Sequence, residues 1–467
     1  MPTVPITFIK GDKVGSETDY RDALPVNMYG VIKPLFGADG YMSQYPGLTQ
    51  FASTSGASRG GVWNPRFRKH FRVQGNDFVE IDSSGSVTVL GVVPGNDTVS
   101  LPYSFNTQAI IANGRYFLYD ATNGFREVTD SDVGDPIDGV WVDGYYFFCD
   151  KQNLFHTNIS DESQVDPLAF ATSEFSPDPT LAVAKTQDNK VAVFNRYTTE
   201  FFQNVATDNF AFQRLTQRAI NSGIVGTHAK AVYGAQFFIL GGNKEESPSA
   251  YIMTVGGVQK IATREVDKII NTYTEDELST VVVEAYSEDA TTFVKYHLPN
   301  ETLLFNETLA KRVGYEQAWS ILGTNREENY RGIHLIPEAS LGKWVCGDKR
   351  SGNVGILDET VTTQYGDMAE WFLFTPFSYI ETGSIDEMEV ETIPGFTGSN
   401  DASVFVSLTQ NGFTYGGQWV QLYGKSYQYS NRFIVRRLGY IRDWVGFRLR
   451  GLSRSKMAFA RGFIKVG

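Results

Sequence analysis

Two short patterns in the sequence contain residue types that could perform catalysis. Gly56-Ala57-Ser58-Arg59-Gly60 matches the G-x-S-x-G pattern of a hydrolase nucleophile, which needs a strand before the serine and a helix after it. The following Gly61-Val62-Trp63-Asn64-Pro65 cannot form a helix, so a glycine-rich turn is the preferred interpretation. Gly424-Lys425-Ser426 is similar to the end of a phosphate-binding loop, but Trp419 stands where that loop needs its first glycine. Neither pattern predicts an active site.

Acidic residues and histidines are the candidates for binding a metal ion. Asp130, Asp132, Asp135 and Asp138 lie close together in the sequence and could hold a hard cation such as calcium. Gly134 breaks the spacing of an EF-hand loop, so a solvated acidic loop is the preferred interpretation, and whether it binds a cation stays open. The five histidines are scattered without the spacing of metal ligands. We expect no resident metal and no cofactor.

The overall charge argues against a protein that coats nucleic acid. The 467 residues carry a formal net charge of −12, whereas neutralising phosphates requires an excess of Lys and Arg. The charge is uneven, because residues 425–467 contain eleven basic side chains and one acid, Asp443. This polarity predicts two faces that contact different partners.

The cysteines and the ends of the sequence indicate a cytoplasmically made protein. Cys149 and Cys346 are too few for a disulfide framework, and both lie in apolar runs, so we expect them to be buried in a reducing compartment. Residues 1–10 lack the pattern of a secretion signal. No apolar run approaches the roughly 20 residues that cross a membrane.

A repeated unit of turn, aromatic strand and turn organises the middle of the chain. It is clearest from Asn113 to Gly124, where two Asn-Gly turns enclose a short aromatic run. Similar units are marked by turns at positions 77, 114, 144, 189, 234, 289 and 342. A four-stranded blade takes roughly 40 to 50 residues, so the spacing predicts an all-β fold, a β-propeller of six or seven blades.

Changes in pattern divide the chain into three expected regions. Residues 1–50 are rich in Pro, Gly and Tyr and predict an extended N-terminal arm. The propeller is expected over 51–360 with a small helical insertion near 263–282. There, Thr274 begins a capping box, and one helical face carries a candidate docking surface formed by Val266, Ile269, Ile270 and Tyr273, although packing on the propeller rim is the simpler interpretation. Alternating strands over 361–467 predict a C-terminal β-sandwich-like module.

The basic strands of this C-terminal module form a candidate assembly interface. Phe447 and Leu449 are expected to face one side of the sheet, and Arg448 and Arg450 the other. Few aromatic residues stand between the arginines to stack on bases, so docking onto an acidic protein surface is favoured over phosphate contact. The candidate interface residues are Arg432, Arg436, Arg437, Arg442, Arg448 and Arg450.

Short motifs that follow one another along the whole chain carry a family resemblance. They include Leu24-Pro25-Val26-Asn27-Met28, Ser58-Arg59-Gly60, His297-Leu298-Pro299, Cys346-Gly347-Asp348-Lys349, Gln364-Tyr365-Gly366, Leu373-Phe374-Thr375-Pro376 and Val445-Gly446-Phe447-Arg448-Leu449-Arg450. In these motifs and in their order the chain resembles the tail hub, or packaged-DNA stabilisation, proteins of short-tailed bacteriophages. The blade region between them diverges, so individual contact residues are not transferred.

The resemblance implies a structural role in a virion tail that is assembled in the cytoplasm of the host bacterium. It implies a six-fold ring of copies below the portal and its adaptor, which helps to retain packaged DNA and later forms part of the ejection channel. The implied partners are other copies of the chain, the portal adaptor protein, a tailspike or tail fibre, and the tail needle. Double-stranded DNA is implied only as cargo, with no catalytic residues and no direct membrane insertion.

A glycan-binding or glycan-hydrolysing β-propeller is the alternative. Such a protein needs aromatic rings and carboxylates that converge in one pocket. The sequence contains 14% aromatic residues and many acids, but it does not show which of them meet.

Overall fold

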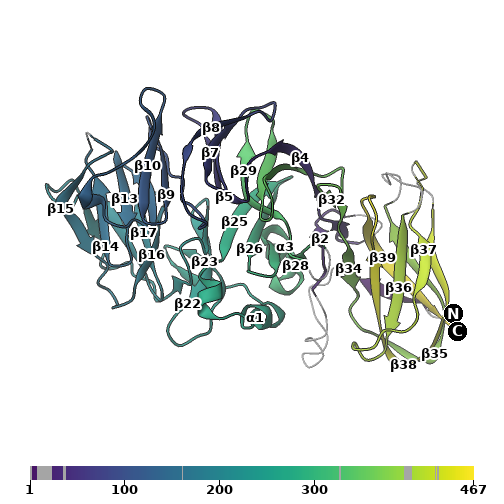
Figure 1. Cartoon of the computed structure of the whole chain (residues 1–467). Coiled ribbons are helices and arrows are strands. Elements are labelled where there is room, and N and C mark those ends of the chain that lie inside the picture. The colour runs from purple at the N-terminus through teal and green to yellow at the C-terminus, as the bar shows by residue number, and fades with distance from the viewer. Residues whose placement is uncertain are drawn as a thin grey trace.

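The computed structural model describes residues 3–7, 24–34, 38–159, 161–324, 328–393, 402–425, 427–428 and 431–467. The described chain forms a ring of small antiparallel sheets and, beside it, a sandwich of long strands (Figure 1). Both ends of the chain lie at the sandwich (Figure 1). The predicted all-β architecture with a C-terminal sandwich module is confirmed.

The ring is a propeller of seven blades, so the larger of the two expected numbers is confirmed. The first three blades contain β5 (Ser58–Asn64), β6 (Lys69–Gln74), β7 (Asp77–Ile81) and β8 (Val87–Val92); β9 (Gln108–Ala112), β10 (Arg115–Asp120) and β11 (Gly124–Glu127); and β12 (Asp138–Val142), β13 (Tyr145–Cys149), β14 (Asn153–Thr157) and β15 (Val165–Thr172). The next three contain β16 (Thr180–Lys185), β17 (Val191–Asn195), β18 (Thr199–Asn204) and β19 (Phe212–Arg214); β20 (Gly223–Ile224), β21 (Lys230–Tyr233), β22 (Gln236–Gly242), β23 (Ser249–Thr254) and β24 (Gly257–Lys260); and β25 (Val282–Glu288), β26 (Thr291–His297), β27 (Thr302–Asn306) and β28 (Trp319–Leu322).

The seventh blade closes the ring with a strand from the N-terminal part of the chain. Strand β4 (Gly47–Ser53) pairs antiparallel with β31, so that Gly47 lies opposite Asp358 and Ser53 opposite Asn353. Sequence-distant strands therefore share one sheet, which protects the strand edges of the ring. The other strands of this blade are β29 (Gly332–Glu338), β30 (Lys343–Asp348), β31 (Asn353–Asp358), β32 (Thr363–Gln364) and β33 (Asp367–Met368).

The seven turns marked in the sequence fall one in each blade, and the structure explains their uneven spacing. In the second blade, residues 100–103 form bridges to β9 and take the place of the innermost strand. The turn at Asn113-Gly114 therefore comes after the second strand position of this blade. In the third blade the turn at Asp143-Gly144 follows the first strand, which shortens the gap between these two marks. The two longest gaps contain helices: α1 (Arg264–Ile270) and α2 (Glu275–Leu278) in one, α3 (Glu307–Val313) in the other.

Aromatic strands fill the space between neighbouring blades. Alternate side chains of β10 face opposite ways. Tyr116 packs against Phe148 of the third blade, with ring centroids 4.9 Å apart, whereas Phe117 joins a cluster with Phe71 of the first blade. Both cysteines are buried and free, as predicted. The repeated aromatic strand thus supplies the packing between blades.

The centre of the propeller is held by the carboxylate of Asp138. Its Oδ1 accepts a hydrogen bond from the Ser100 hydroxyl at 2.6 Å. Its Oδ2 accepts from the backbone N–H of Val183 at 2.9 Å and from Lys230 Nζ at 2.7 Å. The four residues belong to blades 2, 3, 4 and 5, and Asp138 is only 3% exposed. One buried ion pair therefore links four neighbouring blades.

The helices between blades 5 and 6 pack on the propeller. Thr274 forms the predicted capping box with Glu277. Val266 and Ile270 are buried in the propeller core, and Ile269 and Tyr273 are partly buried against it. The apolar helical face expected as a docking surface is therefore already covered in large part by this chain. In the part of the chain that the structure describes, no helix has the length and apolarity to cross a membrane.

The sandwich collects strands from both ends of the chain. Its sheet order is β2-β3-β39-β35-β38-β36-β37, with β1 beside β39 and β34 beside β38. The described residues of the expected N-terminal arm therefore pair with the C-terminal module and, through β4, with the propeller. The strands are β1 (Thr3–Thr7), β2 (Met28–Val31), β3 (Tyr41–Gln44), β34 (Trp371–Phe374), β35 (Ser378–Thr392), β36 (Ser403–Thr409), β37 (Trp419–Leu422), β38 (Phe433–Gly451) and β39 (Ala458–Val466).

Replacing Asp138 tests the role of the central ion pair. Asp138→Ala leaves the largely buried ammonium of Lys230 without its carboxylate, so we expect the free energy of unfolding in urea to fall by about 3 to 5 kcal/mol. Asp132→Ala is the control, because Asp132 is exposed on the adjoining loop. A loss of less than about 1 kcal/mol in Asp138→Ala would show that the blades do not depend on this contact.

Candidate functional site

The junction between propeller and sandwich is built on the segment before β2. Val26 forms a bridge to Ile321 on the propeller side and to Phe372 on the sandwich side. Its N–H donates to Phe372 O and its carbonyl accepts from Phe372 N–H, both at 3.0 Å, while Asn27 N–H donates to Ile321 O at 2.8 Å. The backbone of this segment therefore hydrogen-bonds to both the propeller and the sandwich, as a strand between them would.

The Asn27 side chain adds a second set of bonds at the same place. Its Nδ2 donates to Gly323 O at 2.7 Å and to Glu370 O at 2.6 Å, and its Oδ1 accepts from Gly323 N–H at 3.0 Å. Asn27 has a φ of 54°, in the left-handed region that Asn tolerates better than most residues. Asn27 is 3% exposed, and its two bonds to Gly323 are buried, whereas the bond to Glu370 is partly buried.

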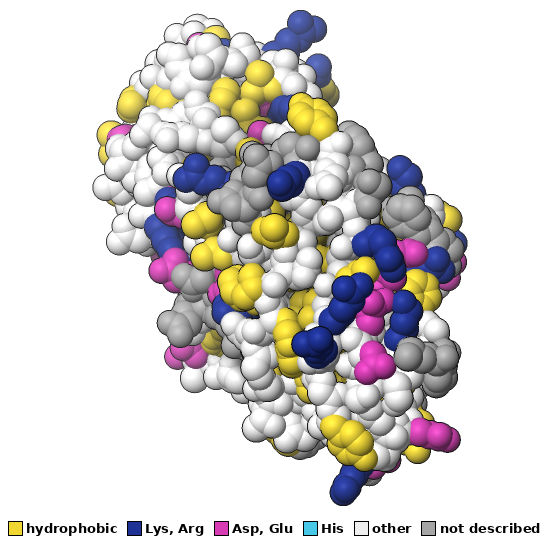
Figure 2. Space-filling view, turned by 90° about the vertical axis from the view of Figure 1, so that its right-hand side faces the viewer, with side chains coloured by type: hydrophobic (Ala, Val, Ile, Leu, Met, Phe, Trp, Pro, Cys, Tyr) yellow, Lys and Arg dark blue, Asp and Glu magenta, His cyan; other side chains and the backbone are white. Residues whose placement is uncertain are grey.

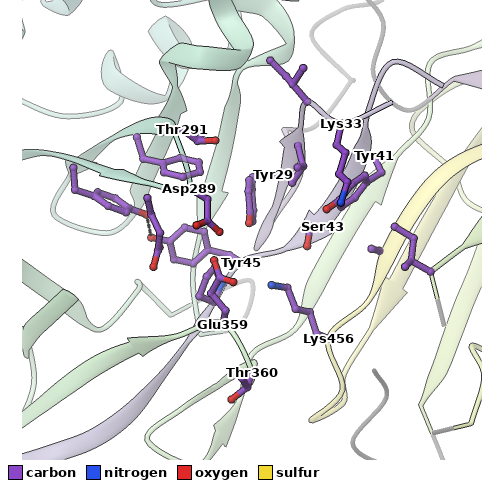
Figure 3. A pocket seen from close by; sticks show the side chains of 18 residues that line it. Tyr29, Lys33, Tyr41, Ser43, Tyr45, Asp289, Thr291, Glu359, Thr360 and Lys456 are labelled. Carbon is purple, nitrogen blue, oxygen red and sulfur yellow. Dashed lines mark hydrogen bonds between the residues drawn. The ribbon is translucent and has the colours of Figure 1, made fainter. Parts of the chain in front are cut away.

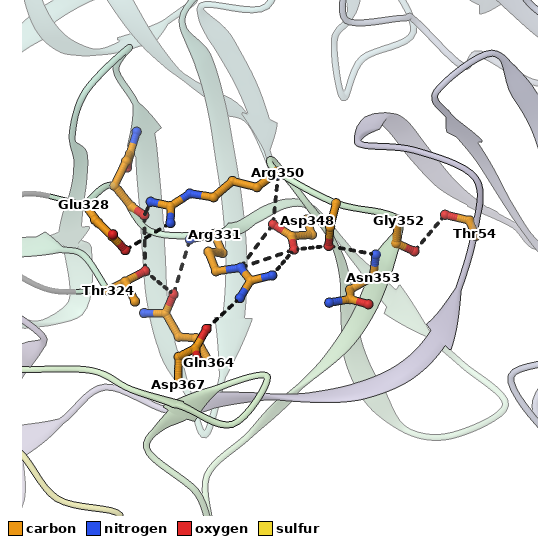
Figure 4. Close-up of polar contacts among 12 residues, drawn as sticks. Thr54, Thr324, Glu328, Arg331, Asp348, Arg350, Gly352, Asn353, Gln364 and Asp367 are labelled. Carbon is orange, nitrogen blue, oxygen red and sulfur yellow. Dashed lines mark hydrogen bonds and ion pairs between the residues drawn. The ribbon is translucent and has the colours of Figure 1, made fainter.

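Arg331 and Gln364 extend this polar network toward the seventh blade (Figure 4). Gln364 Oε1 accepts from Thr324 Oγ1 at 3.0 Å, and Gln364 Nε2 donates to Gly323 O at 3.0 Å. Arg331 donates from Nη2 to Asp348 at 2.6 Å and from Nη1 to Asp367 at 3.0 Å. Asn27, Asp348 and Gln364 all belong to motifs that carry the family resemblance, so those motifs meet at this junction.

A pocket of about 700 Å³ opens beside the junction (Figure 3). The carboxylates of Glu288, Asp289 and Glu359 line it together with aromatic rings, including those of Tyr29 and Tyr41. Burial raises the pKa of Glu288 to about 7, with a further contribution from the nearby carboxylates of Glu359 and Asp289. Aromatic rings and carboxylates thus converge here, which sequence reasoning could not establish.

Half of the predicted interface arginines form ion pairs within the chain. The signal that sequence reasoning missed is the alternation of Glu387, Glu389 and Glu391 along β35, which places their carboxylates beside β38 and β39. Lys and Arg side chains consequently alternate with Asp and Glu on this side of the molecule (Figure 2). The pairs are Arg432 with Glu389 at 2.7 Å, Arg436 with Glu387 at 3.0 Å and Arg450 with Glu370 at 2.8 Å.

The remaining three arginines differ in their surroundings. The Arg448 guanidinium lies 4.2 Å from the ring centroid of Tyr415. Arg437 and Arg442 are exposed, and neither has an ion pair within the described chain. Phe447 and Leu449 are buried while Arg448 and Arg450 are partly exposed, so the predicted alternation is confirmed. The basic strands carry less free positive charge than the sequence indicates.

The catalytic and metal-binding candidates do not assemble into working sites. Ser58 Oγ lies 3.0 Å from His334 Nδ1, but β5 leads into β6 instead of a helix. His334 Nε2 has no hydrogen-bond partner among the described residues, so no carboxylate orients the ring. Asp138 of the acidic loop is the central blade contact, and no cluster of metal-ligating side chains occurs in the described chain.

Another histidine does lie between a carboxylate and a hydroxyl. His297 Nε2 is 3.1 Å from Glu284 Oε2, and its Nδ1 is 3.2 Å from Thr302 Oγ1. Thr302 is fully buried, and its hydroxyl also receives a hydrogen bond from Lys349 Nζ of the next blade at 3.0 Å. A substrate could not reach this hydroxyl, so the arrangement links blades 6 and 7.

Two neighbouring arginines test the network at the junction. Arg331→Gln leaves the buried Asp348 carboxylate without its cation, so we expect the free energy of unfolding in urea to fall by about 3 kcal/mol. Arg350→Gln removes an exposed pair with Glu328 and should cost at most about 1 kcal/mol. Equal losses in the two variants would contradict a special role for Arg331.

The raised pKa of Glu288 predicts an unusual pH dependence. Because the folded-state pKa of about 7 exceeds the ordinary value of 4.5, ionised Glu288 opposes folding above pH 7, and this cost fades as the pH falls toward 4.5. Glu288→Gln should therefore raise the free energy of unfolding by roughly 1 to 2 kcal/mol at pH 8, allowing for screening of a half-buried group. Urea unfolding at pH 5 should show a much smaller gain, and an equal gain at both pH values would contradict the assignment.

Both the propeller and the sandwich match known protein families. The model of the bacteriophage P22 Gp10 β-propeller family matches residues 3–362, and that of the P22 Gp10 β-sandwich family matches residues 370–467. The tail hub protein gp10 of Salmonella phage P22 is 28% identical over 480 residues, which cover 98% of each chain. That relative is named as a tail hub protein, which agrees with the expectation of a structural, non-enzymatic role.

Solved propeller structures show a weaker likeness. A streptogramin B lyase is 10% identical, with a TM-score of 0.40 over 66% of this chain and 96% of its own. The Pan2 WD40 domain of Neurospora crassa is 6% identical, with a TM-score of 0.43 over 67% of this chain and 95% of its own. These two likenesses carry no functional argument. The two family matches together span nearly the whole chain, so this protein belongs to the bacteriophage P22 Gp10 family of tail hub proteins, structural components of the virion tail.

Proposed function

We propose that this chain is one protomer of a six-fold hub ring below the portal and its adaptor. In that position it retains packaged DNA, docks tailspikes or fibres and the tail needle, and forms part of the ejection channel. The virion tail is assembled in the host cytoplasm. The observation that carries the proposal is the match to a tail hub protein over 98% of both chains, because propeller, junction and sandwich are then shared as one unit.

The centre of the propeller supports a channel that lies between protomers. A cavity at the inner strands measures about 290 Å³ and is lined by residues that include His228, Lys230 and Glu284. His228 contacts the Thr98 carbonyl within 3.1 Å, and Lys230 is paired with Asp138. This space is far too small for a DNA duplex, so DNA would pass between copies of the chain and not through one propeller.

The charge of the chain suits such a channel. With a net charge of −12, an acidic wall would repel DNA phosphates and keep the polymer sliding. The pocket at the junction does bring together the aromatic rings and carboxylates that the glycan-binding alternative requires. The family assignment favours the tail hub over that alternative.

Ring formation with purified components tests the proposed function. We expect electron microscopy of this protein mixed with portal-adaptor complexes to show rings, whose formation weakens as salt is raised. The double variant Arg437→Glu and Arg442→Glu should bind roughly tenfold more weakly if these exposed arginines contact an acidic partner. Arg312→Glu, an exposed change on α3, is the control. Absence of rings with the wild-type chain would refute the hub, and unchanged assembly of the double variant would refute the arginine interface.

A further inference from the structure

The pocket beside the junction has walls from three separate parts of the chain. Glu288 and Asp289 come from the hairpin between β25 and β26, and Glu359 from the turn after β31. Tyr29 and Tyr41 come from β2 and β3. In Figure 3, Asp289 and Glu359 lie on one side of the pocket, and Lys33 and Lys456 lie toward the other. The volume of about 700 Å³ is in the range of pockets that hold small ligands.

The three carboxylates lack the partners that other acids of this chain have. Within the described residues, the side chains of Glu288, Asp289 and Glu359 form no ion pair and no hydrogen bond. On β35, by contrast, Glu387, Glu389 and Glu391 each pair with Lys or Arg. Carboxylates that crowd one another in a recess gain stability when a cation enters it. The charged groups that act on Glu288 from surrounding elements, or face it across the pocket, are Glu359, Asp289, Lys295, Lys343, Lys33 and Lys456.

The aromatic wall of the pocket already surrounds the amino group of one lysine on its inner side. Lys295 is fully buried, and its Nζ has no hydrogen-bond partner within the described chain. That Nζ lies 5.7 Å from the ring centroid of Tyr45, 5.1 Å from that of Tyr286 and 5.0 Å from that of Tyr330. Tyr45 and Tyr286 also line the pocket. The negative faces of aromatic rings attract cations, so this wall is suited to organic cations that leave water.

We propose that the junction pocket binds an organic cation, an ammonium or guanidinium group on a short aliphatic arm. Glu288, Asp289 and Glu359 neutralise its charge, and the rings of Tyr29 and Tyr41 cover its aliphatic part. A Lys or Arg side chain of a partner and a free aliphatic diamine share this chemistry. The proposal concerns the pocket alone and does not depend on the tail hub assignment.

Calorimetric titration of the full chain with two probes tests the proposal. Putrescine represents the free diamine, and N-acetyl-L-arginine methylamide represents a side chain of a partner protein. We expect saturable binding of at least one probe with a Kd of roughly 1 mM at pH 8. Binding of putrescine alone identifies a free diamine as the ligand, and binding of the arginine amide alone identifies a partner side chain.

Paired variants separate the pocket from general charge. The double variant Glu288→Gln and Glu359→Gln should weaken binding by about tenfold or more. The control Glu381→Gln and Asp386→Asn removes the same charge from exposed positions of the sandwich and should bind as the wild type does. Because Glu288→Gln is expected to stabilise the fold, lost binding in the first variant would not arise from unfolding. Equal binding by both double variants would overturn the proposal.

Competition with protons gives an independent measurement. Burial and the neighbouring carboxylates raise the pKa of Glu288 to about 7, so protons and the cation compete for this carboxylate. The apparent affinity should therefore fall about tenfold between pH 8 and pH 6. The organic-cation assignment would be overturned if neither probe bound, if the affinity did not change with pH, if the pocket preferred Mg²⁺, or if neutral glucose bound saturably.

Discussion

The carboxylate of Asp138 accepts hydrogen bonds from three other blades while it is almost completely out of solvent. A buried carboxylate is stable only when its oxygens are bonded and a cation lies nearby, and Lys230 supplies that cation. The four blades are thus held around one carboxylate. The pairing of β4 with β31 closes the ring at the seventh blade. The propeller is therefore a solid support whose central cavity is far smaller than a nucleic acid.

The same principle operates at the junction, where polar groups are bonded and removed from solvent. Asn27 bonds to segments of the propeller and of the sandwich, and Arg331 holds Asp348 and Asp367 together within the seventh blade. Since β1, β2 and β3 belong to the sandwich sheet and β4 to the propeller, the N-terminal part crosses between the two. The propeller and the sandwich are therefore connected through this segment and do not behave as independent parts.

The net charge of the C-terminal residues does not show which basic side chains are paired. Some form ion pairs with glutamates of β35, and others are unpaired in the part of the chain that the structure describes. The ion pairs of Glu387, Glu389 and Glu391 lie at the surface with their glutamates partly exposed, so they contribute little stability, but they set the pattern of surface charge. Arg437 and Arg442 are exposed on this surface and have no ion pair within the described residues. At the junction pocket, three carboxylates share one recess with Lys33 and Lys456. Exposed basic side chains and a cluster of carboxylates therefore lie at separate places on the molecule.

The sequence by itself determined the β class, the helical capping box at Thr274, the alternation of β38 and one turn in each of seven blades. These are local properties, since turn residues and period-two patterns act over a few residues. Motif order also identified the family. Only the tertiary structure decided that Asp138 is a blade contact instead of part of a cation loop, that Glu residues of β35 neutralise Arg432 and Arg436, and that Glu288 meets Glu359. Each of these pairs comes from segments far apart in the chain, so their meeting depends on strand order and ring closure, which no local pattern contains.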